Sequence, residues 1–158
     1  MKEVELSQGQ RAIVDDWNYD DVSQYKWYAM WDKHTKSFYA MRHTSKSSGA
    51  KPVLMHSYIA KTPRGMKTDH INHNTLDNRE ENLRVCTNSQ NLMSRGKQSN
   101  NTSGYKGVGK KGKMWGAQIK INGKYKFLGT WHTPEEAAIA YDTAARIIHG
   151  EFAYQNFP

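Results

Sequence analysis

Between residues 65 and 91 the sequence concentrates histidine, aspartate and asparagine, the side chains that bind metal ions or move protons. Asp69 and His70 are adjacent, and Asn82 and Asn91 follow them. Hydrolysis of a phosphodiester needs a base that makes hydroxide from water, and a cation that offsets charge on the phosphoryl and departing oxygens. His70, with an ordinary pKa near ~6.5, is the natural base. Asp69 and Asn91 offer oxygen ligands, which suit Mg²⁺ or Mn²⁺ better than zinc.

The local patterns predict the elements that would position these side chains. We expect a strand ending at His70, a polar loop, a strand over Leu83–Cys86, and a helix that starts at Thr87 or Asn88 and runs through Ser94. This order can bring Asp69 and His70 against the first helical turn, where Asn91 lies. An isolated Asp-His pair is usually an ordinary surface pair, but its spacing from Asn82 and Asn91 favours a catalytic site. Arg84 is either a phosphate contact or an exposed strand residue.

The segment from Val53 to Asn91 resembles the HNH endonucleases, the ββα-metal nucleases, in the form whose last histidine is replaced by asparagine. The resemblance implies that His70 is the general base and that Asn82 holds the loop and the base in place. It also implies that Asp69 and Asn91 are the metal ligands. The chain departs from many relatives after His56, where they have arginine. Phage homing endonucleases of this architecture often carry a small DNA-binding domain after the nuclease.

Charge is distributed unevenly along the chain. The formal net charge is +8, from 23 Lys and Arg against 15 Asp and Glu, and residues 92–132 contain nine Lys or Arg and no Asp or Glu. Neutralised phosphates release counterions, so a polyanion, and double-stranded DNA in particular, is the expected partner. We expect no membrane association, because no run approaches the ~20 apolar residues that span a bilayer. No obligate protein partner is evident.

The single cysteine, Cys86, excludes an internal disulfide and paired-cysteine zinc knuckles. The amino-terminal residues do not resemble a signal peptide. We therefore expect the cytoplasm, or the host cytoplasm if a phage encodes the chain.

The carboxy-terminal third predicts a small domain after a polar linker at residues 94–103. We expect strands at Tyr105–Val108, Trp115–Ile121 and Lys124–Leu128, the last two joined by the hairpin turn Asn122-Gly123. Thr133-Pro134-Glu135-Glu136 predicts a helix start with a capping box, and Gly150 predicts its end.

Alternation in the middle strand predicts which face meets the helix. Trp115, Ala117, Ile119 and Ile121 should pack inward, and the alternate residues should face outward. A sheet of this size fits the DNA major groove. The expected DNA contacts are Lys106, Lys110, Lys111, Gln118, Lys120 and Lys124. In the third strand either Lys126 or the pair Tyr125 and Phe127 could face DNA.

This region resembles the Apetala-two/ethylene-response-factor DNA-binding domain from Thr102 to Pro158. The resemblance is carried by Ser103-Gly104-Tyr105-Lys106-Gly107-Val108, Leu128-Gly129-Thr130-Trp131, Glu135-Glu136-Ala137-Ala138, Ala140-Tyr141-Asp142 and Asn156-Phe157-Pro158. It implies that the sheet, and not the helix, enters the major groove. Gln118, Lys120, Tyr125 and Phe127 differ from that family's contact residues, so its base preference does not transfer.

The predicted fold class is therefore α+β, with an HNH nuclease domain of the ββα-metal type at residues 1–93, a linker at 94–103 and a three-stranded antiparallel sheet packed on one helix at 104–158. Aromatic residues between Met1 and Ala60 are most simply a core that buttresses the nuclease motif, with strands at Trp27–Trp31 and Phe38–Arg42. The predicted function is site-specific, homing-like DNA cleavage with one divalent metal ion. The alternative is a non-catalytic, sequence-specific DNA-binding regulator that retains the motif as a relic.

Overall fold

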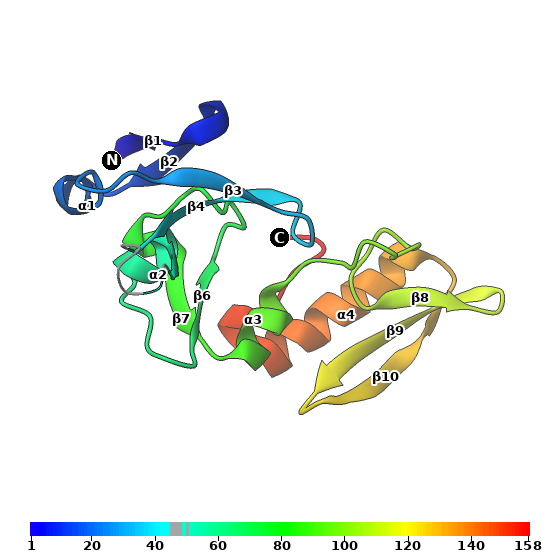
Figure 1. Ribbon diagram of the computed structural model, residues 1–158. Coiled ribbons are helices and arrows are strands. Elements are labelled where there is room, and N and C mark those ends of the chain that lie inside the picture. The colour runs from blue at the N-terminus through cyan, green and yellow to red at the C-terminus, as the bar shows by residue number, and fades with distance from the viewer. Residues whose placement is uncertain (45–48, 50) are drawn as a thin grey trace. The chain divides into compact units, whose positions relative to one another are not determined.

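The computed structural model describes residues 1–44, 49 and 51–158. Small sheets and few helices make up two compact units, Met1–Asn88 and Ser89–Pro158 (Figure 1). The first unit contains β1 (Lys2–Glu5), β2 (Arg11–Val14), α1 (Asp16–Val22), β3 (Tyr28–Asp32), β4 (Ser37–His43), β5 (Pro52–Leu54), α2 (Met55–Ile59), β6 (Lys67–His70) and β7 (Leu83–Cys86). No helix among the described residues is long and apolar enough to cross a membrane.

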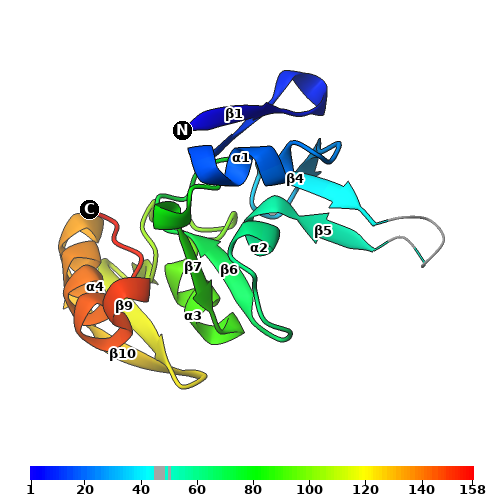
Figure 2. The same cartoon turned by 90° about the vertical axis from the view of Figure 1, so that its left-hand side faces the viewer.

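Among its described residues, the first unit contains three antiparallel sheets: β1–β2, β3–β4–β5 and β6–β7. In Figure 2, α2 lies beside β6, so the helix that follows β5 packs against the strand that carries Asp69 and His70. The polar loop between β6 and β7 is attached to β2 by backbone hydrogen bonds. The Ile13 amide donates to the Leu76 carbonyl at 2.8 Å, and the Asn78 amide donates to the Ile13 carbonyl at 2.7 Å. The amino-terminal hairpin therefore supports the loop that follows His70.

The core of the first unit is smaller than its aromatic content predicts. Its buried members are Val4, Ala12, Val14, Val22, Trp27, Ala40, Met55 and Ile59. Trp27 is the buried aromatic of this cluster, and its indole Nε1 donates to the Val22 carbonyl. Trp17 and Trp31 are 71% and 52% exposed, so the expectation that these aromatics form a common core is wrong for them. Three members of this core, Val4, Ala12 and Val14, belong to β1 and β2, hairpin strands that the sequence analysis did not predict.

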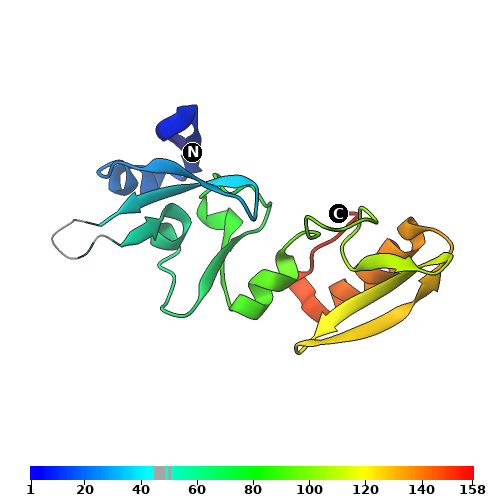
Figure 3. The same ribbon diagram turned by 45° about the vertical axis from the view of Figure 1, so that its right-hand side comes forward.

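Local capping and turn signals determine the elements of the second unit. It begins within α3 (Asn88–Ser94), at Ser89. The elements that follow are β8 (Val108–Lys111), β9 (Met114–Ile121), β10 (Lys124–Trp131) and α4 (Pro134–His149). The sheet order is β10–β9–β8, and the long β9–β10 hairpin lies along α4 (Figure 3). Asn122 and Gly123 both have positive φ, 48° and 82°, as a two-residue hairpin turn of this type needs. The predicted capping box is present, with Thr133 and Glu136 each accepting from the other's backbone amide.

The structure confirms the predicted inward face of this sheet and corrects the predicted bounds of its first strand. Ala117 and Ile119 are buried against α4, with Trp115 and Ile121 packed around them. The predicted strand Tyr105–Val108 is wrong, because β8 begins only at Val108. The preceding segment turns at Gly107, whose φ of 77° suits glycine, and a Cβ there would lie 2.1 Å from Cδ2 of Tyr141.

The segment predicted as a linker belongs to the second unit in this structure. Lys97 Nζ donates to the Gly104 carbonyl and Asn101 Nδ2 donates to the Tyr105 carbonyl, both at 2.8 Å. The Ser103 hydroxyl is within hydrogen-bonding distance of the Val108 carbonyl at 2.9 Å. Polar side chains therefore tie a segment without apolar residues to the loop before β8 and to the first residue of that strand.

Candidate active site and nucleic-acid interface

Asp69 and His70 end β6 and are almost completely buried, with 8% and 5% of their surfaces exposed. The antiparallel register places Asp69 opposite Arg84 and His70 opposite Leu83. Arg84 donates to Asp69 Oδ2 from Nε at 2.9 Å and from Nη2 at 2.7 Å. Arg84 is thus held in an ion pair with the neighbour of the candidate base, and with its side chain 14% exposed it is not the exposed strand residue that was one of its two expected roles.

Three side chains surround the imidazole of His70. Its Nε2 lies 3.4 Å from Asn78 Oδ1. The His56 ring meets it edge to face, with centroids 4.9 Å apart and planes at 86°, and the Tyr39 ring lies 6.3 Å away. Burial lowers the pKa of His70, and burial together with His70 lowers the pKa of His56 to about 3. Both rings are therefore neutral at neutral pH, which leaves His70 able to accept a proton.

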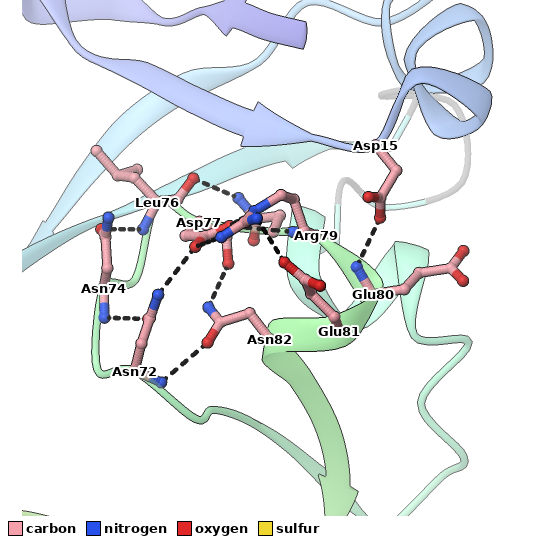
Figure 4. A network of polar contacts seen from close by, with 10 residues as sticks. Asp15, Asn72, Asn74, Leu76, Asp77, Arg79, Glu80, Glu81 and Asn82 are labelled. Atoms are coloured by element: carbon pink, nitrogen blue, oxygen red, sulfur yellow. Dashed lines mark hydrogen bonds and ion pairs between the residues drawn. The ribbon is translucent and has the colours of Figure 1, made fainter. Parts of the chain in front are cut away.

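Asn82 closes the polar loop with both ends of its side chain (Figure 4), and also with its backbone. Its Oδ1 accepts from the Asn72 amide at 2.9 Å, and its Nδ2 donates to the Asp77 carbonyl at 2.7 Å. Its backbone carbonyl accepts from the Ile71 amide at 2.9 Å. These bonds join the residues directly after His70 to the start of β7, so Asn82 fixes the path of the chain beside the base.

Asp77 is the buried anion at the centre of the loop, and 3% of its surface is exposed. Arg79 donates to its two carboxylate oxygens from Nε and Nη2, each at 2.8 Å, and Asn72 Nδ2 donates at 2.9 Å (Figure 4). The hydrogen bonds from Arg79 hold the pKa of Asp77 below its ordinary value. At its other end the loop is anchored by the Glu80 amide, which donates to Asp15 Oδ2 at 2.7 Å.

Asn78 and Tyr39 are the site residues that the sequence analysis did not identify. Asn78, in the polar loop that follows His70, presents Oδ1 to its ring. Tyr39 belongs to β4 and reaches His70 only through the tertiary fold. The density of asparagine and aspartate after His70 is the one sequence signal that could have identified Asn78.

The metal ligands predicted from the sequence are distributed over both units. Asp69 lies in the first unit, and Asn91, on α3, lies in the second, so their convergence on one ion stays a prediction. Within the part of the chain that the structure describes, no group of three His, Cys, Asp or Glu side chains could hold a metal ion. One carboxylate and one amide fit a hard cation that completes its shell with water and phosphate oxygens. They do not fit structural zinc.

On the second unit the outward face of the sheet carries a mixed basic and aromatic surface, which we call the outer face. Its members are Gly109, Lys111, Gly116, Gln118, Lys120, Tyr125 and Phe127. Tyr125 pairs with Lys120 and Phe127 pairs with Gln118 across the β9–β10 ladder. The structure thereby resolves the third strand, since the aromatic pair, and not Lys126, shares a face with Gln118 and Lys120.

The remaining predicted DNA contacts lie elsewhere on this unit. Lys110 pairs with Trp115, and its Nζ lies 4.2 Å from that ring's centroid on the side of the helix. Lys124 pairs with the inward-facing Ile121. Lys106 directs Nζ at the carbonyls of Met93 and Arg95, and burial lowers its pKa to about 8. Of the six predicted contacts, Lys111, Gln118 and Lys120 are brought together on the outer face.

Comparisons with known proteins match both parts of the chain. A family model described as HNH endonuclease matches residues 60–93. An uncharacterized HNH endonuclease of Acanthamoeba polyphaga mimivirus is 33% identical over 142 residues, covering 85% of this chain and 68% of that protein. Protein 3.8 of Escherichia phage T7 is 33% identical over 93 residues, covering 58% of this chain and 76% of that protein. The dehydration-responsive element-binding protein 2D of Arabidopsis thaliana is 41% identical over 71 residues, covering 42% of this chain and 34% of that protein.

Proposed function

This chain belongs to the HNH endonuclease family, and we propose that it is a site-specific, homing-like DNA endonuclease whose base is His70. The observation that carries the proposal is the buried Asp69–His70 pair at the end of β6, beside a loop closed by Asn82. This arrangement lies within the segment that matches the family model. Burial and fixed hydrogen bonds are what a positioned catalytic group requires.

His70 would take the proton from the attacking water. If Nε2 carries hydrogen and donates to Asn78 Oδ1, Nδ1 holds the lone pair that accepts this proton. The neighbouring His56, whose pKa is about 3, stays neutral and adds no charge that would oppose protonation of His70. Its ring, edge to face with that of His70, restricts the orientation of the base.

Asp69 would present its carboxylate to a cation on the scissile phosphate. HNH nucleases generally use a divalent metal ion, and a bound Mg²⁺ or Mn²⁺ supplies charge stabilisation for the phosphoryl and departing oxygens. Nε and Nη2 of Arg84 donate to Oδ2 of Asp69, and we assign Oδ1 to the cation. Asn91 is the proposed second ligand. Arg84 would then orient the carboxylate of Asp69, and this role does not require Arg84 to contact the phosphate itself.

The second unit would hold double-stranded DNA on its outer face. Lys111 and Lys120 supply positive charge there, and Gln118 supplies an amide that can pair with adenine in the major groove. The relation to the plant element-binding protein supports this assignment over the region of that match. Recognition by one unit and chemistry by the other would together make cleavage site-specific.

Plasmid cleavage tests the proposal. Supercoiled plasmid incubated with the full chain and Mg²⁺ or Mn²⁺ should become nicked or linear, and chelation by EDTA should prevent it. His70→Ala should reduce the cleavage rate by at least about 10²-fold, as expected for loss of a general base. His34→Ala, in the exposed turn between β3 and β4, is the matched control and should cleave normally.

Two results would contradict the proposal. Plasmid that stays supercoiled with each divalent metal, together with tight binding that Mg²⁺ does not alter, would identify a DNA-binding regulator. Cleavage at the wild-type rate by His70→Ala would remove the assigned base.

A further inference from the structure

Two aromatic rings on β10 are exposed although apolar. Tyr125 and Phe127 are 66% and 54% exposed. They alternate with Lys126, so both project from the outer face. Burial of such rings would stabilise a complex, whereas their exposure contributes nothing to the stability of this unit's core.

The outer face around these rings is low in relief and positively charged. Gly109 pairs with Gly116 across the β8–β9 ladder, and a Cβ at Gly109 would meet no atom within 4 Å. A Cβ at Gly116 would lie 3.1 Å from Cε2 of Phe127, so that ring lies over the glycine. Lys111 Nζ is 5.5 Å from the centroid of the Phe127 ring, and Lys120 Nζ is 5.5 Å from that of Tyr125. An anionic partner can therefore approach the sheet closely.

Gln118 and Phe127 form a cross-strand pair, and together they match the edge of one kind of base pair. A glutamine amide pairs with N6 and N7 of adenine in the major groove. A phenyl ring makes no conventional hydrogen bond, and the apolar group that bases present in that groove is the thymine methyl. An A·T pair, or two neighbouring ones, offers both features side by side.

We propose that Tyr125 and Phe127 contact thymine methyl groups in the major groove, so that the outer face selects duplex sites with A·T pairs opposite Gln118. This inference rests on the proposed function, because it takes DNA as the ligand of the outer face. Stacking of the rings on unpaired bases is the competing use of exposed aromatics. We favour duplex binding because Gln118 lies directly opposite Phe127. In that position its amide would pair with the major-groove edge of a base while the ring contacts the methyl group.

Replacing thymine by uracil removes the methyl group and keeps every hydrogen-bonding atom of the base pair. Sites are first selected by the full chain from random duplexes in EDTA, which prevents cleavage, and are then synthesised with thymine or with uracil. The affinity of the wild-type chain should fall about fourfold for each contacted methyl, and so by roughly 16-fold for two. The double variant Tyr125→Ala/Phe127→Ala should bind both duplexes equally.

Variants on the same sheet make the experiment specific. Lys126→Ala, whose side chain lies on the other face of β10, should keep the full difference between thymine and uracil. Phe127→Leu should keep part of it, which shows that an apolar contact is measured even if the alanine variant folds poorly. Gly109→Val adds bulk to the outer face at a position with space around it and should weaken binding to both duplexes.

Three outcomes would overturn the inference: equal wild-type affinity for both duplexes, a difference that persists in the double alanine variant, or tighter binding of the single strand than of the duplex. Failure here is distinguishable from failure of the proposed function. If the chain nicks plasmid but binds the thymine and uracil duplexes equally, only this inference is refuted. Methyl-sensitive binding without cleavage in Mg²⁺ refutes only the nuclease.

Discussion

The two units hold their candidate functional residues in opposite ways. In the first unit Asp69, His70 and Asp77 are buried, and each has a hydrogen-bonding side chain beside it. In the second unit Gln118, Tyr125 and Phe127 project from the β9–β10 ladder and are exposed. Chemistry needs groups whose position and protonation are fixed before substrate arrives, whereas recognition needs groups left open for a partner.

This difference makes the two surfaces vulnerable to different changes. A substitution in the polar loop should alter stability and cleavage together, because the same hydrogen bonds support both. A substitution on the outer face should alter DNA affinity and leave stability nearly unchanged, since surface changes usually stay within about 0.5 kcal/mol.

The largest effect is expected at Asn82. Asn82→Ala removes the bonds to the Asn72 amide and the Asp77 carbonyl, and leaves buried polar groups unpaired. The free energy of unfolding should fall by about 3 kcal/mol, and cleavage should fall at least about 10²-fold. Thermal denaturation and plasmid nicking measure the two losses. Asn74→Ala, at an exposed position in the same loop, should lose much less stability and cleavage. Equal losses in the two variants would show that the hydrogen bonds of Asn82 contribute no more than those of Asn74.

Arg84 should matter next, through the charge of Asp69. Arg84→Ala leaves a mostly buried carboxylate without the hydrogen bonds of its ion pair, which should cost about 2 kcal/mol of stability. Because a divalent cation at Asp69 would offset the same charge, Mg²⁺ should raise the melting temperature of this variant more than that of the wild type. A variant whose melting temperature ignores Mg²⁺ would argue against Asp69 as a ligand.

The stability of the polar loop should depend on pH through Asp77. Its pKa is depressed by Arg79, so the folded state binds the proton more weakly than the unfolded state does. The stabilisation is therefore complete above the ordinary value of 3.8 and is lost as pH falls through the folded pKa. Asp77→Asn should reduce stability by about 1.5 kcal/mol at pH 7, and the gap to the wild type should narrow below pH 3.8. Urea unfolding of both proteins at neutral and at acidic pH measures this difference in the free energy of unfolding. A difference that widens in acid would contradict the depressed pKa of Asp77.

The smallest effect is expected at the start of α4. Thr133→Ala removes the hydroxyl that accepts from the Glu136 amide, and should cost about 1 kcal/mol. Cleavage at saturating DNA should not change, because this cap lies in neither the loop nor the outer face. Calorimetry and a nicking assay at high protein concentration test both parts. A large loss of cleavage would show that stability of the second unit controls the chemistry.

Elements defined by neighbouring residues could be predicted from the sequence. The strand ending at His70, the strand Leu83–Cys86 and the capped helix after Thr133 all follow from local signals. The inward face of β9 followed from simple alternation. Each of these depends on residues a few positions apart, so no tertiary information was needed.

Features that depend on distant residues could not be predicted. The rings of Tyr39 and His56 reach His70 from β4 and α2, and nothing in the local sequence marks that contact. The face of Tyr125 and Phe127 was undecided because both alternating sets in β10 are compatible with an exposed strand; the pairing with Lys120 and Gln118 decides it.

A paired assay of binding and cleavage tests the division of labour most directly. His70→Ala and the variant Gln118→Ala/Lys120→Ala/Phe127→Ala are compared with the wild type, with affinity measured in EDTA and single-turnover nicking measured in Mg²⁺ at saturating DNA. We predict that His70→Ala binds like the wild type and does not nick, and that the outer-face variant binds weakly and nicks at the normal rate once saturated. If His70→Ala nicks normally, or if the outer-face variant keeps its affinity, the account is contradicted.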